Sequence, residues 1–302
     1  MAKPRELRRR IKSVQSTRKI TKTMELVATS KLKRAQDRVV AARPYAAALA
    51  GVIGDLYAPE LAERFPLLRQ PAGAIRRAAL VVITSNRGLC GAFNASLIRE
   101  GRRRIEQLES GGEGGGAAVD LHLIGKKGIT YFKFAKRPIA SQRTDIGDKP
   151  TAAHAAEVMN PLMAQFEAGV VDAVEVVFPQ FRSAVSTPPT TLRILPITPP
   201  RAGEDGGGGG RGRGGAINYI LKPSAEAILE QLLPLYARNQ LYRALVETAA
   251  AFYGAQRTAM KSATDNAGDM LDILQRTYNR ARQTQITQEL AEIVGGAEAL
   301  KG

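Results

Sequence analysis

A long stretch without proline ends the chain. The last proline is Pro234, and from Leu235 almost to Gly302 the sequence keeps one helical pattern, in which apolar residues recur in steps of three and four. A helix of roughly 60 residues would be about 90 Å long, longer than any single domain that this chain could form. The pattern therefore predicts a projecting helix that needs a partner helix. Its apolar stripe comprises Leu241, Leu245, Ala249, Phe252, Ala263, Ala267, Met270, Leu274, Ile286, Leu290, Ile293 and Ala297.

The partner helix is expected at the other end of the chain. Residues 1–43 contain no glycine, and Pro4 stands where the first turn of a helix tolerates proline. Two long amphipathic helices bury their stripes most economically against each other, and they would run antiparallel because a folded domain connects them. The repeat breaks near Arg18, which predicts an irregular, closely spaced coil. The N-terminal stripe comprises Leu7, Ile11, Val14, Ile20, Met24, Val27, Ala28, Leu32, Ala35 and Val39.

Between the two ends the sequence alternates strands and helices. This alternation predicts a mostly parallel sheet flanked by helices, and two glycine-rich stretches predict flexible surface loops. We expect strands over 77–85, 119–124, 171–178 and 191–197, helices over 94–108, 127–135 and 152–167, and loops over 111–116 and 203–215. The expected segments are an N-terminal helix over 1–58, an α/β domain over 75–200, a glycine-rich loop over 201–216 and a C-terminal helix over 222–302.

Charge and cysteine content narrow the class of protein. The net charge is +16, and residues 1–38 are especially rich in lysine and arginine, which implies a negatively charged partner: nucleic acid, an anionic membrane surface or an acidic protein ring. Cys90 is the single cysteine, so a disulfide within the chain is excluded and a reducing compartment is favoured. Neither an apolar run of roughly 20 residues nor a secretory signal is present, which predicts a soluble or peripherally attached protein.

Enzymatic chemistry finds little support in the residues. Residues 85–91 follow a predicted strand, where phosphates often bind, but their glycines match no nucleotide-binding pattern. Cys90 could act as a nucleophile with His122 or His154 as base, but neither histidine lies in a recognisable motif, so a buried structural thiol is favoured. No Cys/His cluster has the spacing of metal ligands, and we expect neither metal nor cofactor.

A nucleic-acid function is the alternative reading. Residues 124–129 resemble the glycine loop of KH domains, although a tight turn between strand and helix needs the same glycines. Arg211 and Arg213 lie in a glycine-rich stretch of the kind found in RNA-binding tails. Together with the basic N-terminal helix, these features leave a basic RNA-binding protein open.

Polar residues in the C-terminal helix suggest contacts with another protein. Residues 261–270 place Thr, Asp, Asn and Gly in a helix interior, where each costs some tenths to about 1 kcal/mol relative to Ala. A polar collar then gives way to an apolar tip, which predicts a hydrophobic socket in a partner. The collar comprises Arg280, Arg282, Gln283, Thr284, Gln285, Thr287 and Gln288, and the tip Leu290, Ile293, Val294, Ala297 and Leu300.

Several segments together resemble one known family over nearly the whole chain. Residues 286–297 (ITQELAEIVGGA) and 263–267 (ATDNA) look like its C-terminal signature. The N-terminal IKSV and KITKTMELVA, the central RGLCG and the GKKG that follows are also similar to its motifs. The family is that of the gamma subunits of F-type ATP synthases.

The resemblance implies both a fold and a role. The fold would be an antiparallel coiled coil of the terminal helices beside a Rossmann-like α/β foot. The coil would be the central rotor shaft in a ring of alpha and beta subunits, and the foot, with the epsilon subunit, would sit on the membrane ring of c subunits. Proton flow would turn the shaft at the cytoplasmic face of the bacterial inner membrane. Nucleotide and catalytic groups would belong to alpha and beta, so this chain would be no enzyme and would bind no nucleic acid.

The resemblance also assigns roles to single residues. Arg282, Gln283 and Thr287 match the collar that meets a loop of a beta subunit, and Leu290 to Leu300 match the tip held in an apolar bearing. Met24, with Arg8, Lys22 and Lys31 around it, would face an acidic segment of beta, and Tyr219 would reach the c ring. The glycine insertions depart from the family pattern, and no paired cysteines support the redox regulation of chloroplast relatives.

Overall fold

The computed structural model describes residues 4–57, 64–71, 73–111, 116–198 and 224–299. The chain divides into two compact units, one formed by residues 1–30 with 256–302 and the other by residues 31–255. We call the first the coil unit and the second the sheet unit. Helix α1 (Pro4–Leu56) and helix α6 (Ala225–Ala299) contribute residues to both units.

The sheet unit is built on five strands in the order β3-β2-β1-β4-β5. The first four run parallel, and β5 pairs antiparallel with β4. The strands are β1 (Arg77–Ile83), β2 (Ala118–Ile124), β3 (Ser141–Arg143), β4 (Ala173–Pro179) and β5 (Pro189–Leu195). The shorter helices are η1 (Pro66–Leu68), α3 (Phe93–Glu109), α4 (Lys126–Phe134) and α5 (Ala152–Glu167).

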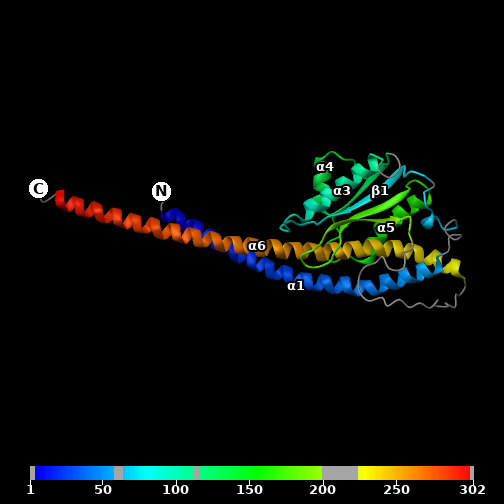
Figure 1. The fold of residues 1–302 in the computed structure, drawn as a ribbon, viewed down its shortest axis with the longest axis horizontal. Helices are drawn as coiled ribbons and strands as arrows, with labels where there is room; N and C mark the ends of the chain where they lie inside the picture. The colour runs from blue at the N-terminus through cyan, green and yellow to red at the C-terminus, as the bar shows by residue number, and fades with distance from the viewer. Residues whose placement is uncertain (1–3, 58–63, 72, 112–115, 199–223, 300–302) are drawn as a thin grey trace. The chain divides into compact units, whose positions relative to one another are not determined.

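Helices cover both faces of this sheet, so its central strand is buried on both sides. In β1, Val81 and Ile83 belong to a core shared with α5 and the first half of α6, whereas Leu80 and Val82 belong to a core shared with α3 and α4. Figure 1 shows α3 and α4 on one side of the sheet and α5 on the other. A strand buried on both faces reads as a continuous apolar run, which is why β1 was predictable.

The turn between β2 and α4 shows whether its glycines belong to a KH-like loop or to a tight turn. Gly125 has a φ of 100°, and a Cβ there would lie 2.1 Å from the carbonyl oxygen of Thr84. Thr84 in turn accepts a hydrogen bond from the amide of Gly128 at 2.9 Å through its Oγ1. The glycines are therefore needed for a tight turn inside the fold.

The predicted elements are found, with two corrections. Helix α6 begins at Ala225, within the predicted segment 222–302 and with Pro234 inside it, and α1 extends to Leu56, within the predicted segment 1–58 and with Pro44 inside it. The loss of a backbone hydrogen bond at each proline is outweighed by burial of the same helices' apolar residues, such as Leu229 and Leu233. The short strand β3 was not predicted. Strand β5 lies two residues earlier than expected and is antiparallel.

The compact units do not follow the predicted segments 1–58, 75–200, 201–216 and 222–302. Residues 32–53 of α1 and 229–253 of α6 contribute buried side chains to the two cores of the sheet unit. The structure therefore groups half of each long helix with the sheet. The glycine-rich loop predicted over 201–216 lies outside the described residues.

In the coil unit, α1 and α6 pair antiparallel. Thr264 Oγ1 donates a hydrogen bond to Thr21 Oγ1 at 2.8 Å, and the guanidinium of Arg18 lies 3.8 Å from the position of a Cβ added to Gly268. A lower number in α1 thus meets a higher number in α6, as an antiparallel pair requires. The predicted antiparallel coil is confirmed.

The predicted break of the apolar repeat near Arg18 falls in a stretch, residues 15–20, whose side chains are all exposed. Buried or half-buried positions keep a spacing of seven through this region, at Leu7, Val14, Thr21, Ala28 and Ala35. The predicted stripe residues Ile20 and Val27 are instead 60% and 50% exposed. Thr21 occupies a contact position with a polar side chain, so the seam continues where the apolar pattern is interrupted.

One described helix passes a test of length and composition for crossing a membrane. It is α1, in which one stretch has a mean hydropathy of 1.3. Leu49 and Ile53 of this helix are 6% and 1% exposed and belong to the core of the sheet unit. Val40 of the same helix, in contrast, is 61% exposed, so the apolar stretch is buried only in part.

Candidate functional site at the free end of α6

The last turns of α6 leave the coil. The register at Thr21 and Thr264 places Pro4, the first described residue of α1, opposite about residue 282 of α6. Ala281 is half-buried, and residues 282–297 are all exposed. Figure 1 shows α6 continuing past the start of α1. About 18 residues of α6 thus form a single helix, roughly 27 Å long.

This free segment is helical because of contacts within itself. Gln285 Nε2 donates to Glu289 Oε1 at 2.8 Å, and Gln288 Nε2 donates to Glu292 Oε1 at 3.0 Å, both four residues apart. Such pairs add some tenths of a kcal/mol each to an isolated helix. These hydrogen bonds stabilise the helical conformation of the segment, and the side chains of residues 282–297 stay exposed.

The predicted collar lies where the single helix begins. Arg282, Gln283 and Thr287 are exposed. Within the described ranges, no side-chain hydrogen bond or ion pair engages any of the three. Their donors and acceptors are therefore available to another protein.

The predicted tip is exposed although it is apolar. Leu290, Ile293 and Val294 are 57%, 67% and 60% exposed, and Ala297 is exposed as well. Leu300 lies outside the described residues. Apolar side chains gathered at the end of a helix are typical of an interaction site.

The residues of the predicted basic surface around Met24 are divided between the two compact units. Arg8 and Lys22 lie two heptads apart on one side of α1, both exposed, and Lys22 Nζ is 3.1 Å from Glu25 Oε2. Met24 is half-buried, on another side of the helix from these two residues. Lys31, in contrast, belongs to the sheet unit and lies 3.6 Å from a carboxylate oxygen of Asp148. Tyr219 lies outside the described residues.

Sequence reasoning missed a polar cluster in the sheet unit. Asp148 forms ion pairs with Arg87 and Lys31, and Arg87 Nη2 donates to Tyr253 Oη at 3.0 Å. The four side chains come from four separate segments of the chain. Arg87 in the RGLCG motif was the one available signal, because nothing local marks the other three.

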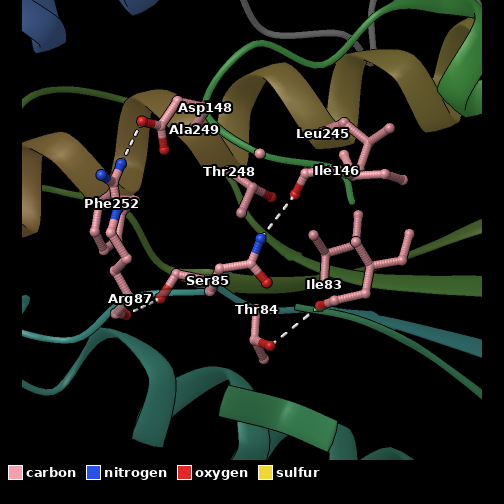
Figure 2. A pocket seen from close by; sticks show the side chains of 13 residues that line it. Ile83, Thr84, Ser85, Arg87, Ile146, Asp148, Leu245, Thr248, Ala249 and Phe252 are labelled. Carbon is pink, nitrogen blue, oxygen red and sulfur yellow. Dashed lines mark hydrogen bonds and ion pairs between the residues drawn. The ribbon is translucent and has the colours of Figure 1, made fainter. Parts of the chain in front are cut away.

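The carboxyl edge of the sheet, where α/β proteins bind nucleotides, is filled. The edge lies between β1 and β4, where the strand order reverses. Leu245, Thr248 and Phe252 of α6 line this place, as Figure 2 shows, and leave a cavity of about 50 Å³. Asn86 closes it further, since its Nδ2 donates to the carbonyl oxygens of Thr144 and Ile146 at 2.9 and 3.2 Å. The space admits water molecules but no nucleotide.

Cys90 has the surroundings of a structural thiol. It is 3% exposed and accepts a hydrogen bond from Asn94 Nδ2 at 3.3 Å. Burial raises the pKa of the Cys90 thiol, which disfavours the thiolate that a nucleophile needs. His122 instead contacts Ser141 through Nδ1, at 2.7 Å, and His154 caps α5 with Thr151. In the described residues, no group of three or more His, Cys, Asp or Glu side chains could hold a metal.

Known proteins with this sequence and fold are ATP synthase subunits. A family model described as ATP synthase matches residues 3–300. The ATP synthase gamma chain of Gemmatimonas aurantiaca is 60% identical over 302 residues, which are 100% of both chains. A chain in the central stalk and c-ring structure of Tetrahymena thermophila mitochondrial ATP synthase has a TM-score of 0.60 at 24% identity, covering 81% of this chain and 99% of that one. A chain in an OSCP, F1 and c-ring structure of the Euglena gracilis enzyme has a TM-score of 0.67 at 19% identity, covering 98% and 94%.

The matches in sequence and fold place this chain, with its helical coil and α/β unit, in the class of ATP synthase central-stalk proteins. The chain belongs to the family of ATP synthase gamma chains. Members of this family form the non-catalytic central stalk, or rotor, of the enzyme. The comparisons give no support to the RNA-binding alternative.

Proposed function

We propose that this chain turns as the rotor inside a ring of alpha and beta subunits and couples proton flow through a c ring to the catalytic sites of that ring. The single observation that carries the mechanism is the free end of α6, an exposed apolar tip behind an exposed polar collar. The proposal is supported by the solved Euglena complex of OSCP, F1 and c ring, in which one chain has a similar fold. The sheet unit would serve as the foot, with the epsilon subunit bound to it.

The apolar tip is the proposed bearing. A helix end that exposes Leu290, Ile293 and Val294 to water is stabilised when a partner covers these side chains. A socket in the alpha and beta ring would cover them, together with Ala297 and Leu300, and hold the axis of rotation. The contact is apolar and therefore non-directional, so the helix can turn within it.

The collar and the basic surface are the proposed contacts with beta subunits. Arg282, Gln283 and Thr287 would hydrogen-bond to a beta loop, and Arg8, Lys22 and Met24 would meet an acidic segment of beta. Exposed ion pairs contribute about 0–1 kcal/mol each, so they can form and break as the rotor turns. We place Tyr219 at the c ring and the complex at the cytoplasmic face of the bacterial inner membrane.

Truncation of the tip tests the bearing. A chain that ends at Gln285 is assembled into the complete ATP synthase in membrane vesicles. We expect ATP hydrolysis to persist while ATP-driven proton pumping falls at least tenfold, because the shaft has lost its upper support. Thr277→Ala is the control, since Thr277 lies outside the collar and its hydroxyl bonds to the carbonyl oxygen of Ile273 in its own helix at 2.9 Å. Pumping at the full-length level by the truncated complex would contradict the proposal.

A further inference from the structure

One carboxylate in the sheet unit ties together four segments of the chain. Asp148, in the loop between β3 and α5, forms an ion pair with Arg87 of the loop after β1 and lies 3.6 Å from Lys31 Nζ of α1. Arg87 also donates to the hydroxyl of Tyr253 in α6 at 3.0 Å. The ammonium of Lys31 lies 5.4 Å from the centre of the Tyr253 ring. We call Asp148, Arg87, Lys31 and Tyr253 the Asp148 cluster.

The cluster is partly shielded from water, and its one carboxylate lies among several cations. Burial by itself raises the pKa of Asp148, but hydrogen bonds from Tyr253 and Arg87 outweigh it and bring the pKa below its ordinary value. Burial, followed by the hydrogen bond to Asp148, raises the pKa of Tyr253 well above its ordinary value. Arg38 adds a further cation, whose Nη1 donates to the backbone oxygen of Asp148 at 3.2 Å. At neutral pH the cluster therefore contains the carboxylate of Asp148, the neutral phenol of Tyr253 and the cationic side chains of Arg87 and Lys31.

The position of the cluster along the two long helices is the second observation. The sheet unit begins at Lys31 in α1 and ends at Ala255 in α6, two residues after Tyr253. The cluster therefore holds both helices at the place where they leave the sheet unit.

We propose that the Asp148 cluster is a positioning site that fixes both shaft helices to the foot, so that torque passes between them without slippage. The proposal rests on the rotor function proposed above. Apolar packing in the two cores resists separation but has little directional preference, whereas charge-assisted hydrogen bonds fix both distance and angle. Asp148 binds one helix through Lys31 and the other through Arg87 and Tyr253. A twist of either helix relative to the sheet must stretch these contacts.

The proposal changes the role of Lys31. The family resemblance assigns Lys31 to the surface that faces an acidic segment of beta. In the structure its ammonium already has a carboxylate and an aromatic ring as neighbours. Lys31 is thereby separated from Arg8 and Lys22, which remain candidates for the contact with beta.

The experiment compares loaded and unloaded work by the complete ATP synthase. Asp148→Asn keeps the size of the side chain but removes its charge, and Asp148→Glu restores the charge. We expect Asp148→Asn to leave ATP hydrolysis in uncoupled vesicles within twofold of the parent, while the proton gradient that the complex builds falls at least threefold. Asp148→Glu should recover at least half of that gradient. Asp145→Asn is the matched control, because Asp145 lies in the same loop and pairs with Arg143 on the surface.

Each other result overturns the proposal. Equal losses of hydrolysis and pumping in Asp148→Asn would indicate a general defect, and an equal effect of Asp145→Asn would indicate a role of the loop rather than of the cluster. A loss in Lys31→Gln without one in Asp148→Asn would return Lys31 to the beta contact. If the chain ending at Gln285 uncouples the complex and Asp148→Asn does not, the cluster fails while the rotor function stands. If truncation has no effect, the rotor function itself fails.

Discussion

Two leucines on the apolar stripe of α6 meet opposite environments. Leu241, in the sheet unit, is fully buried, whereas Leu290, in the coil unit, is 57% exposed. The same helix thus supplies a core to one unit and an uncovered surface to the other. The difference separates the part of the chain that completes its own core from the part whose apolar surface the proposed bearing would cover.

Charged groups follow the same division. In the sheet unit, Glu175 is 1% exposed and accepts hydrogen bonds from Arg104 and Arg193 at 2.6 to 3.0 Å. In the coil unit, Lys261 and Asp265 form an ion pair whose two side chains are more than half exposed. The same type of substitution should therefore lower the free energy of unfolding by several kcal/mol more in the sheet unit than in the coil unit.

The largest expected difference is between two carboxylates. Glu175→Gln removes a buried charge that bridges two arginines and should lower the free energy of unfolding of the isolated chain by about 3–5 kcal/mol. Asp265→Asn breaks an exposed pair and should cost less than about 0.5 kcal/mol. Urea denaturation followed by circular dichroism measures both values. Equal losses in the two variants would show that the buried carboxylate contributes no more to stability than the exposed one.

The two leucines give the next largest difference. Leu241→Ala should destabilise the isolated chain by about 2–5 kcal/mol, because it removes buried methyl groups and leaves a cavity. Leu290→Ala should change its stability by less than about 0.5 kcal/mol, since the side chain is already in water. The same denaturation experiment compares them. A large loss for Leu290→Ala would mean that the tip is covered within the isolated chain.

The sheet could be predicted from sequence because its signals are local. The buried run of β1 and the alternation of strands and helices need no knowledge of distant residues. Strand β3 is three residues long and mostly exposed, so it leaves no such signal. The C-terminal helix was predicted over 222–302, and α6 begins at Ala225 with Pro234 inside it, where Leu229 and Leu233 are buried.

The surfaces were predictable to different degrees. The tip and collar stand out in the sequence because apolar and polar residues segregate along a single helix. The Asp148 cluster does not, since its members are spread from Lys31 to Tyr253 and meet through the fold. Thr21 marks the same limit within the coil: a polar residue at a seam position resembles a break until its partner Thr264 is known.

Two glycines of α6 should respond to alanine with opposite signs. A Cβ at Gly254, in the sheet unit, would lie 2.8 Å from the carbonyl oxygen of Ala184, so Gly254→Ala should destabilise by about 1–3 kcal/mol. At Gly268, in the coil unit, the nearest atom is 3.8 Å away, in the guanidinium of Arg18. Gly268→Ala should stabilise the helix by up to about 1 kcal/mol. Hydrogen exchange of the amides around each site measures the changes, and a shared sign would contradict the comparison.

The smallest expected effect depends on pH and concerns Tyr253. Its pKa is raised in the folded chain, first by burial and then by the hydrogen bond to Asp148, whereas a tyrosine in the unfolded chain loses its proton near pH 10. Above pH 10 the unfolded chain therefore binds fewer protons than the folded chain, so stability that is fully present at neutral pH is lost as the pH rises toward the folded pKa.

Tyr253→Phe removes this dependence along with the hydrogen bond from Arg87. We expect a loss of about 1 kcal/mol at neutral pH and a shallower fall in the free energy of unfolding above pH 10 than in the parent chain. Tyr45→Phe is the control, because Tyr45 is 57% exposed on α1. If the parent and Tyr253→Phe curves ran parallel above pH 10, the hydroxyl would not be held by the Asp148 cluster. Convergence of the two curves would show that the folded chain retains the proton of the Tyr253 hydroxyl, which the Asp148 cluster holds in place.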